Sequence, residues 1–69
     1  MVEYQKRVVE EGSELLNKIE KLVEFIGSSI FNKLEEEDQL LLVQQSALMV
    51  QYHEVLMKRV HRFRKNGTT

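Results

Sequence analysis

The chain has 69 residues and contains no cysteine and no proline, so it forms one domain at most and has neither a disulfide framework nor a thiolate metal site. A chain this short buries a small fraction of its surface, and oligomerisation is the ordinary remaining route to stability. Its net charge of −1 conceals an asymmetry, because residues 1–38 carry ten acids against five cations, whereas residues 39–69 carry five cations against Glu54 alone.

The first predicted helix comprises residues 3–26. Its apolar residues recur at helical spacing on one stripe, at Val8, Leu15, Ile19, Leu22 and Ile26, with Val9, Leu16 and Val23 beside it. Gly27 is placed to end this helix as a left-handed cap. Gly12 lies on the inward stripe, so we expect one of two arrangements. Either the helix breaks there and Ser13 starts a new helix, or the helix is continuous and Leu56 or a ligand fills the gap.

The connector comprises residues 27–34, and its apolar Ile30, Phe31 and Leu34 are expected to plug the end of a hairpin. Four acids, Glu35 to Asp38, favour the start of a second helix because they complement its dipole. That helix is predicted over residues 35–64 and is followed by a frayed tail, 65–69. A short connector makes the two helices antiparallel neighbours. The predicted fold is therefore all-α, a single antiparallel two-helix hairpin over residues 1–69 that assembles into a homo-oligomeric helical bundle.

The second helix is apolar on more than one side. One set of residues is expected to pack on the first helix: Leu41, Leu42, Leu48, Met49, Val55, Leu56, Val60 and Phe63. Val43, Val50 and Met57, with Leu40 and Ala47 nearby, are predicted to line the opposite side. Because a single partner helix cannot cover both sides, we expect subunits to meet along Val43, Ala47, Val50 and Met57.

Three polar residues spaced seven apart, Gln45, Tyr52 and Arg59, are predicted near the centre of the packing face. Buried polar groups need partners. One interpretation is a core network in which Arg59 pairs with Glu11 or Glu14 and Tyr52 bonds to Gln45 or a carbonyl. The other is a pocket in which Tyr52 stacks on a ring and Arg59 binds a phosphate or carboxylate.

Motifs of catalysis are missing from the sequence, which has no Gly-rich phosphate loop, nucleophile elbow or zinc-protease spacing. We expect no enzyme, no cofactor and no metal, with His53 and His61 as solvated or interface residues. The cations from Lys58 to Lys65 fit a nucleic-acid backbone. They equally complement a helix C-terminus, so nucleic acid ranks below other ligands. No apolar run reaches the roughly 20 residues that cross a bilayer, and no signal peptide is present, which favours a cytoplasmic protein without membrane contact.

The order of residues resembles the small two-helix accessory proteins of tailed phages and prophages, including those of crAss-like phages. The first helix matches their pattern E-x-x-E-L-x-x-K-I-x-K-L-x-x-F-I, and the second matches L-L-x-x-Q-x-x-x-M-x-x-Y-x-x-V-L-x-x-R, at Glu11, Glu14, Leu15, Lys18, Ile19, Lys21, Leu22, Phe25, Ile26, Leu41, Leu42, Gln45, Met49, Tyr52, Val55, Leu56 and Arg59. The resemblance spans about residues 5–63. It implies a phage accessory protein in the cytoplasm of an infected bacterium.

Three classes of function follow from these observations. The first is a non-enzymatic anti-defence protein, a sponge that sequesters an anionic, nucleotide-like immune signal in pockets of a homo-oligomer. The candidate ligand-binding residues are Arg59, Tyr52, Gln45, Arg62, Lys58 and Gly12. The second is a protein-interaction module that inhibits a host protein through an exposed helix face. The third, ranked lower, is an accessory protein associated with nucleic acid.

Overall fold

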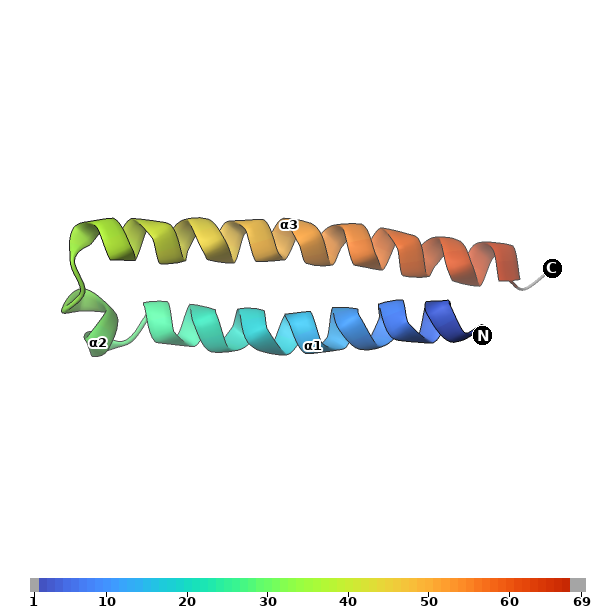
Figure 1. Ribbon diagram of the computed structural model, residues 1–69, viewed down its shortest axis with the longest axis horizontal. Helices are drawn as coiled ribbons and strands as arrows, with labels where there is room; N and C mark the ends of the chain where they lie inside the picture. The colour runs from blue at the N-terminus through green and yellow to red at the C-terminus, as the bar shows by residue number, and fades with distance from the viewer. Residues whose placement is uncertain (1, 68–69) are drawn as a thin grey trace.

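The computed structural model describes the backbone of residues 2–67 and the side chains of residues 2–63. Two long antiparallel helices lie side by side, α1 (Glu3–Ile26) and α3 (Glu36–Gly67), and a one-turn helix, α2 (Ser29–Asn32), joins them (Figure 1). The expected hairpin is therefore present, with a third, short helix inside the connector. Both termini lie at one end, named here the open end, and α2 lies at the other, the turn end. The molecule is a rod of 53 × 15 × 14 Å.

The two long helices meet along a seam of alternating three- and four-residue spacing, the pattern of an antiparallel coiled coil. On α1 the residues that turn inward are Gln5, Val8, Gly12, Leu15, Ile19, Leu22 and Ile26. On α3 they are Gln39, Leu42, Ser46, Met49, His53, Leu56, Val60 and Phe63. Leu56 is the most deeply buried side chain of the seam, with 1 % of its surface exposed. Met49, Val60 and Phe63 pack against the buried cluster around it.

This seam corrects the packing face predicted for α3. Leu42, Met49, Leu56, Val60 and Phe63 do turn inward, but Leu41, Leu48 and Val55 are more than half exposed. Three polar residues, Gln39, Ser46 and His53, occupy seam positions instead. The prediction went wrong because α3 has apolar residues on most of its circumference, so the centre of its apolar surface is not the line that faces α1.

Helix α1 is continuous through Gly12, which excludes the predicted break at Ser13. Gly12 is buried, and the terminal methyl Cε of Met57 fills the space beside it. A Cβ added at Gly12 would lie 2.6 Å from that atom. The gap in the stripe is therefore occupied by a side chain from α3, and the side chain is Met57 rather than the expected Leu56.

The end of α1 does not use the predicted left-handed glycine. Gly27 has φ −81° and ψ 0°, an ordinary right-handed geometry. The helix stops because Ser28 turns to an extended backbone, with φ −90° and ψ 163°. The Ser28 hydroxyl donates to the Phe25 carbonyl at 2.6 Å and accepts from the Phe31 amide at 3.4 Å, so it closes α1 and caps α2 together.

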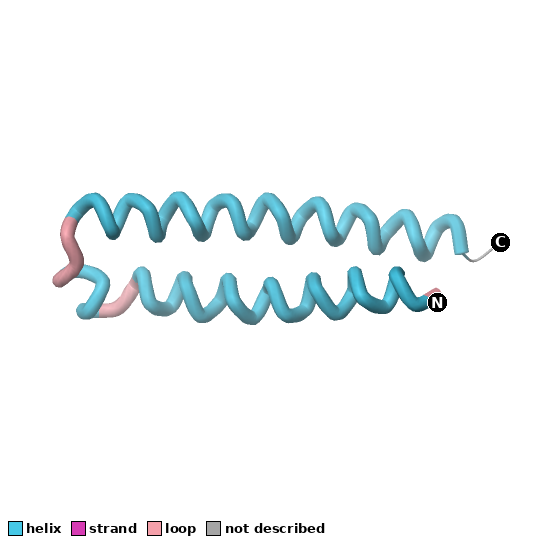
Figure 2. The backbone as a smooth tube through the Cα atoms, in the orientation of Figure 1, coloured by secondary structure: helices cyan, strands magenta, loops and turns pink. Residues whose placement is uncertain are grey.

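The connector plugs the turn end mainly through Phe31, which is buried and meets Phe25 edge to face at 6.4 Å between ring centroids. Leu34 is half-buried, but Ile30 points to solvent, contrary to the prediction that all three residues plug this end. The Gln39 amide nitrogen donates to the carbonyls of Phe31 and Leu34 at 2.9 and 3.1 Å, which ties the connector to α3. Figure 2 shows the loops that join α2 to α1 on one side and to α3 on the other.

The C-terminal helix is longer than predicted. Its start carries Glu36, Glu37 and Asp38 in the first turn, where acids complement the helix dipole. Its helical backbone extends to Gly67 rather than stopping at residue 64. Of the predicted frayed tail, residues 65–67 are helical, and residues 68–69 lie outside the described residues.

Candidate functional site

The three polar residues expected near the centre of the packing face lie beside the seam instead, on the outer flank of α3. Gln45, Tyr52 and Arg59 are all exposed, and Tyr52 shows 47 % of its surface. They precede the seam residues Ser46, His53 and Val60 by one position each. That single step turns them about 100° away from the inward direction, because a helix advances 3.6 residues per turn.

The core network is absent over residues 2–63. The ion pair within this range joins Arg7 Nε to Glu3 Oε1 at 3.7 Å on the exposed side of α1, and it does not involve Arg59. The Gln45 amide nitrogen lies 3.9 Å from the Met49 sulfur rather than bonding to Tyr52. Since these side chains are exposed, water satisfies them and no internal partner is required.

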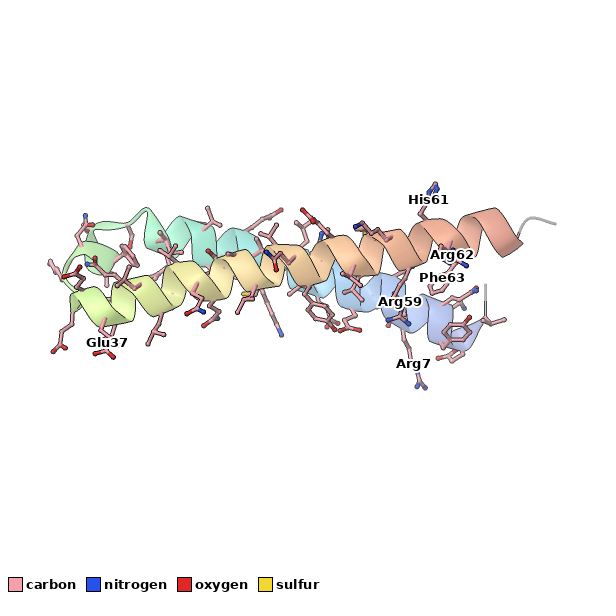
Figure 3. All side chains as sticks on the ribbon, turned by 90° about the horizontal axis from the view of Figure 1, so that it is seen from above. Arg7, Glu37, Arg59, His61, Arg62 and Phe63 are labelled. Atoms are coloured by element: carbon pink, nitrogen blue, oxygen red, sulfur yellow. The ribbon has the colours of Figure 1, made fainter. Side chains whose placement is uncertain are left out.

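Arg59 instead lines a pocket of about 380 Å³ at the open end of the hairpin. Its other lining residues are Tyr4 and Gln5 from the first turn of α1, and Arg62 and Phe63 from α3. Arg59, Arg62 and Phe63 share one face of α3 because they are spaced three and four residues apart. Figure 3 shows Arg59, Arg62 and Phe63 close together near this end, with His61 turned to the opposite side of α3.

An aromatic pair forms the wall between the two helices. The rings of Tyr4 and Phe63 meet edge to face, with centroids 5.6 Å apart and an angle of 84° between planes. Phe63 is half-buried on the seam, whereas Tyr4 is mostly exposed. The pocket therefore combines an apolar, ring-lined wall with the polar side chain of Gln5.

Two guanidinium groups provide the charge of the pocket. Neither Arg59 nor Arg62 forms an ion pair with a carboxylate of residues 2–63. Guanidinium groups bind carboxylates and phosphates with two parallel hydrogen bonds and also stack on rings. A pocket of this volume and composition suits a small ligand that has an anionic group and a planar ring.

Of the six ligand-binding residues predicted from the sequence, the structure brings Arg59 and Arg62 into this pocket. Lys58 is exposed beside them but does not line it. Tyr52 and Gln45 are seven and fourteen residues before Arg59, about 10 and 21 Å along the helix, so they do not converge with it. Gly12 lines a separate depression, with Met57 among its neighbours. The ligand-binding roles of all six stay predictions.

Sequence reasoning missed Tyr4, Gln5 and the exposed edge of Phe63. Tyr4 and Phe63 are 59 positions apart in the chain, and only the antiparallel register of the helices brings them together. The available signal was an aromatic residue in the first turn of one helix opposite an aromatic residue near the basic end of the other.

Two further predictions concern histidines and ions. His53 is half-buried on the seam and His61 is exposed on the far side of α3 (Figure 3). Within the described part of the chain, no group of three or more histidine or carboxylate side chains is arranged to hold a metal ion. No helix among the described residues is both long and apolar enough to span a membrane.

Comparison with known proteins places these features in a family. Residues 2–62 match the Sequestin family. The chain is 39 % identical over 64 residues to the "Uncharacterized 7.5 kDa protein in denB-rIIB intergenic region" of Enterobacteria phage T4, an alignment that covers 93 % of this chain and all of the phage protein. No solved structure matches the chain. These matches confirm the resemblance to small phage accessory proteins, and the chain belongs to the Sequestin family.

Proposed function

We propose that this protein is a non-enzymatic phage protein that sequesters an anionic, nucleotide-like immune signal at the open-end pocket. Arg59 and Arg62 bind the phosphate of the ligand, and the Tyr4–Phe63 wall packs against its ring. The observation that supports this proposal is that two guanidinium groups and two aromatic rings line one pocket. The name of the family, Sequestin, supports sequestration as the mode of action.

The chemistry of the pocket favours binding over catalysis. Among the described residues 2–63, its lining offers guanidinium, amide, phenol and phenyl groups but no carboxylate, histidine or thiol that would act as a general base or nucleophile. Arginine remains protonated at physiological pH, so Arg59 and Arg62 supply fixed positive charge. Such a site retains a ligand without transforming it, which is what stoichiometric sequestration requires.

Isothermal titration calorimetry with ADP and with cyclic di-AMP as probes tests this proposal. ADP presents an adenine ring and a terminal diphosphate, whereas cyclic di-AMP presents internal phosphodiesters, so the pair also reports which kind of phosphate fits. Adenosine is the uncharged reference. We expect at least one phosphate-bearing probe to bind more tightly than adenosine. Equal or undetectable binding of all three would contradict a site that recognises phosphate together with a ring.

Substitution of the arginines locates the binding. Loss of a hydrogen bond to a charged group costs about 1.5–3 kcal/mol, and an open pocket places the effect at the lower end, roughly tenfold in Kd for Arg59→Gln or Arg62→Gln. Lys58→Gln is the matched control, because it removes one positive charge from the same helix turn without touching the pocket. If Lys58→Gln weakens binding as much as Arg59→Gln, the affinity comes from general positive charge and the assigned pocket is wrong.

A second candidate function is inhibition of a host protein through an exposed helix face. The specific observation is the stripe of Leu41, Leu48 and Val55 on α3, which are spaced seven apart and each more than half exposed. Leu48→Lys separates the two candidates, because it interrupts this stripe far from Arg59. If the protein acts through the stripe, Leu48→Lys abolishes protection of the phage in infected cells and leaves nucleotide binding in vitro unchanged.

A further inference from the structure

One long side of the hairpin carries apolar residues from both helices that the seam leaves uncovered. We name it the valine face, and it comprises Val9, Leu16 and Val23 of α1 with Val43, Val50 and Met57 of α3. Each set is spaced seven apart, and each residue follows a seam residue by one position. Between 37 % and 55 % of each side chain is exposed. An apolar surface shared by two helices is a typical interaction site.

The two sets lie on the same side of the molecule. Each of these six residues directly follows the second of the two seam positions of its heptad. In an antiparallel coiled coil, these positions of the two helices lie on the same side of the seam. A single depression confirms this placement, because Val9 and Leu16 line it together with Met57. The sequence had predicted that Val43, Val50 and Met57 lie opposite the packing face. That prediction is wrong, because these residues flank the seam. The Arg59 pocket opens on the other side of the seam.

The two sets also have the same midpoint along the rod. Tyr4 and Phe63 mark one level, because their rings are in contact. Leu16 follows Tyr4 by twelve residues in α1, and Val50 precedes Phe63 by thirteen residues in α3. At 1.5 Å per residue both lie about 18–20 Å from that level. Leu16 and Val50 are thus neighbours at the centre of the face, with Val9 near Met57 on one side of them and Val23 near Val43 on the other.

We infer that the valine face binds a second copy of this chain, related by a two-fold axis perpendicular to the helices at the level of Leu16 and Val50. A two-fold interface is self-complementary. The axis places Leu16 and Val50 against their own counterparts. It also places Val9 against the partner's Val23 and Val43 against the partner's Met57. One axis therefore pairs all six residues, which requires the common midpoint that the two helices share.

The distribution of charge favours this antiparallel arrangement. At the turn end, Glu36 lies seven residues before Val43 and so continues the line of the valine face, with Glu37 beside it. Toward the open end, Lys58 directly follows Met57. The antiparallel dimer sets each acidic end beside the partner's basic end. The alternative face-to-face dimer, with its axis along the helices, would bring the two acidic ends together, and like charges at an interface oppose association.

The length of the rod allows a dimer interface of standard size around the valine face. The valine face itself spans 14 residues on each helix, about 21 Å. If packing continues along one whole long side of the rod, 53 × 15 Å or about 800 Å² in outline, it reaches the area per partner of a standard protein interface. Among the described residues, the hairpin alone buries five large apolar side chains, those of Val8, Leu15, Ile19, Phe31 and Leu56, and only Leu56 is fully buried. A four-helix bundle made of two hairpins would bury the valine face as well. It leaves the Arg59 pocket uncovered, so the dimer and the proposed ligand site are tested independently.

Single-cysteine cross-linking tests both the face and the orientation, because the chain has no cysteine of its own. A disulfide requires Cα atoms within about 7 Å. Under diamide, Val50→Cys is expected to form a disulfide-linked dimer rapidly. Leu48→Cys, at the same level on the opposite flank of α3, is the matched control and should cross-link at least tenfold more slowly. An equimolar mixture of Val43→Cys and Met57→Cys should cross-link faster than either variant alone.

Sedimentation of the unmodified protein completes the test. We expect a dimer at micromolar concentration, dissociated by Val50→Lys, which places two ammonium groups together at the axis, and retained by Leu48→Lys. Circular dichroism of Val50→Lys verifies that the helices persist in this variant. If the variant unfolds, the cross-linking experiment alone tests the position of the interface. A monomeric wild-type protein, or faster cross-linking of Leu48→Cys than of Val50→Cys, would overturn the inference. Faster self-linking of Val43→Cys than of the mixture would overturn the antiparallel orientation.

Discussion

Gly12 offers a sharp test of the packing, because α1 is continuous there and the Met57 side chain of α3 fills the space that a side chain at Gly12 would occupy. We predict that Gly12→Ala stabilises the protein and that Gly12→Leu destabilises it. The added methyl of Gly12→Ala would lie 2.6 Å from Met57 Cε, so Met57 must move. That atom is the far end of a flexible side chain that is 38 % exposed, and a small rotation toward solvent relieves the contact.

The magnitude follows from two opposing effects. Alanine is favoured over glycine in a helix interior by about 0.8–1.0 kcal/mol. A strained rotamer of Met57 costs about 0.5 kcal/mol if it moves only slightly off its minimum. The expected net gain in the free energy of unfolding is about 0.5 kcal/mol, or roughly 2–4 °C in Tm for a domain of this size. Leucine cannot be accommodated by one rotation, and overpacking of this kind costs about 1–3 kcal/mol.

Thermal and urea unfolding followed by circular dichroism at one fixed protein concentration measures these changes. A double-mutant cycle isolates the contact, because Gly12→Ala should gain the full 0.8–1.0 kcal/mol or so when Met57→Ala has removed the obstacle. If Gly12→Ala lowers Tm in both backgrounds, the obstacle is backbone rather than Met57. The account of the gap would then be wrong.

Two further substitutions probe the core and the connector. Leu56→Ala should destabilise the hairpin by about 2–5 kcal/mol in urea unfolding, because it opens a cavity at the most buried seam position. The control, Leu48→Ala on the exposed flank, should change the free energy of unfolding by less than about 0.5 kcal/mol. Equal effects of the two substitutions would contradict the assigned seam. Gln39→Ala should lower the free energy of unfolding by about 1–2 kcal/mol, since it removes the donor shared by the Phe31 and Leu34 carbonyls. In this variant, backbone amide hydrogen exchange should accelerate more in residues 29–34 than in the centre of α1.

The candidate site was only half predictable. Arg59 was chosen from the sequence for its sevenfold spacing from Gln45 and Tyr52, and Arg62 was chosen as a neighbouring cation on the same helix. Tyr4 could not be paired with Phe63, because their contact depends on how far the connector shifts one helix along the other. Tyr52 was chosen for its sevenfold spacing from Arg59, yet residues seven apart on one straight helix lie about 10 Å from each other and do not share a small pocket.

The sequence by itself determined the two long helices, their antiparallel order and the inward face of α1, because the apolar residues of that helix gather on one side, with Val9, Leu16 and Val23 directly beside the inward stripe. Only the tertiary structure decided which line of α3 faces α1. Apolar residues cover most of α3, so several rotations about its axis bury similar apolar area. The contact with the narrow stripe of α1 selects one of them, which places Leu56 at the centre of the core and sends Tyr52 and Arg59 to the surface.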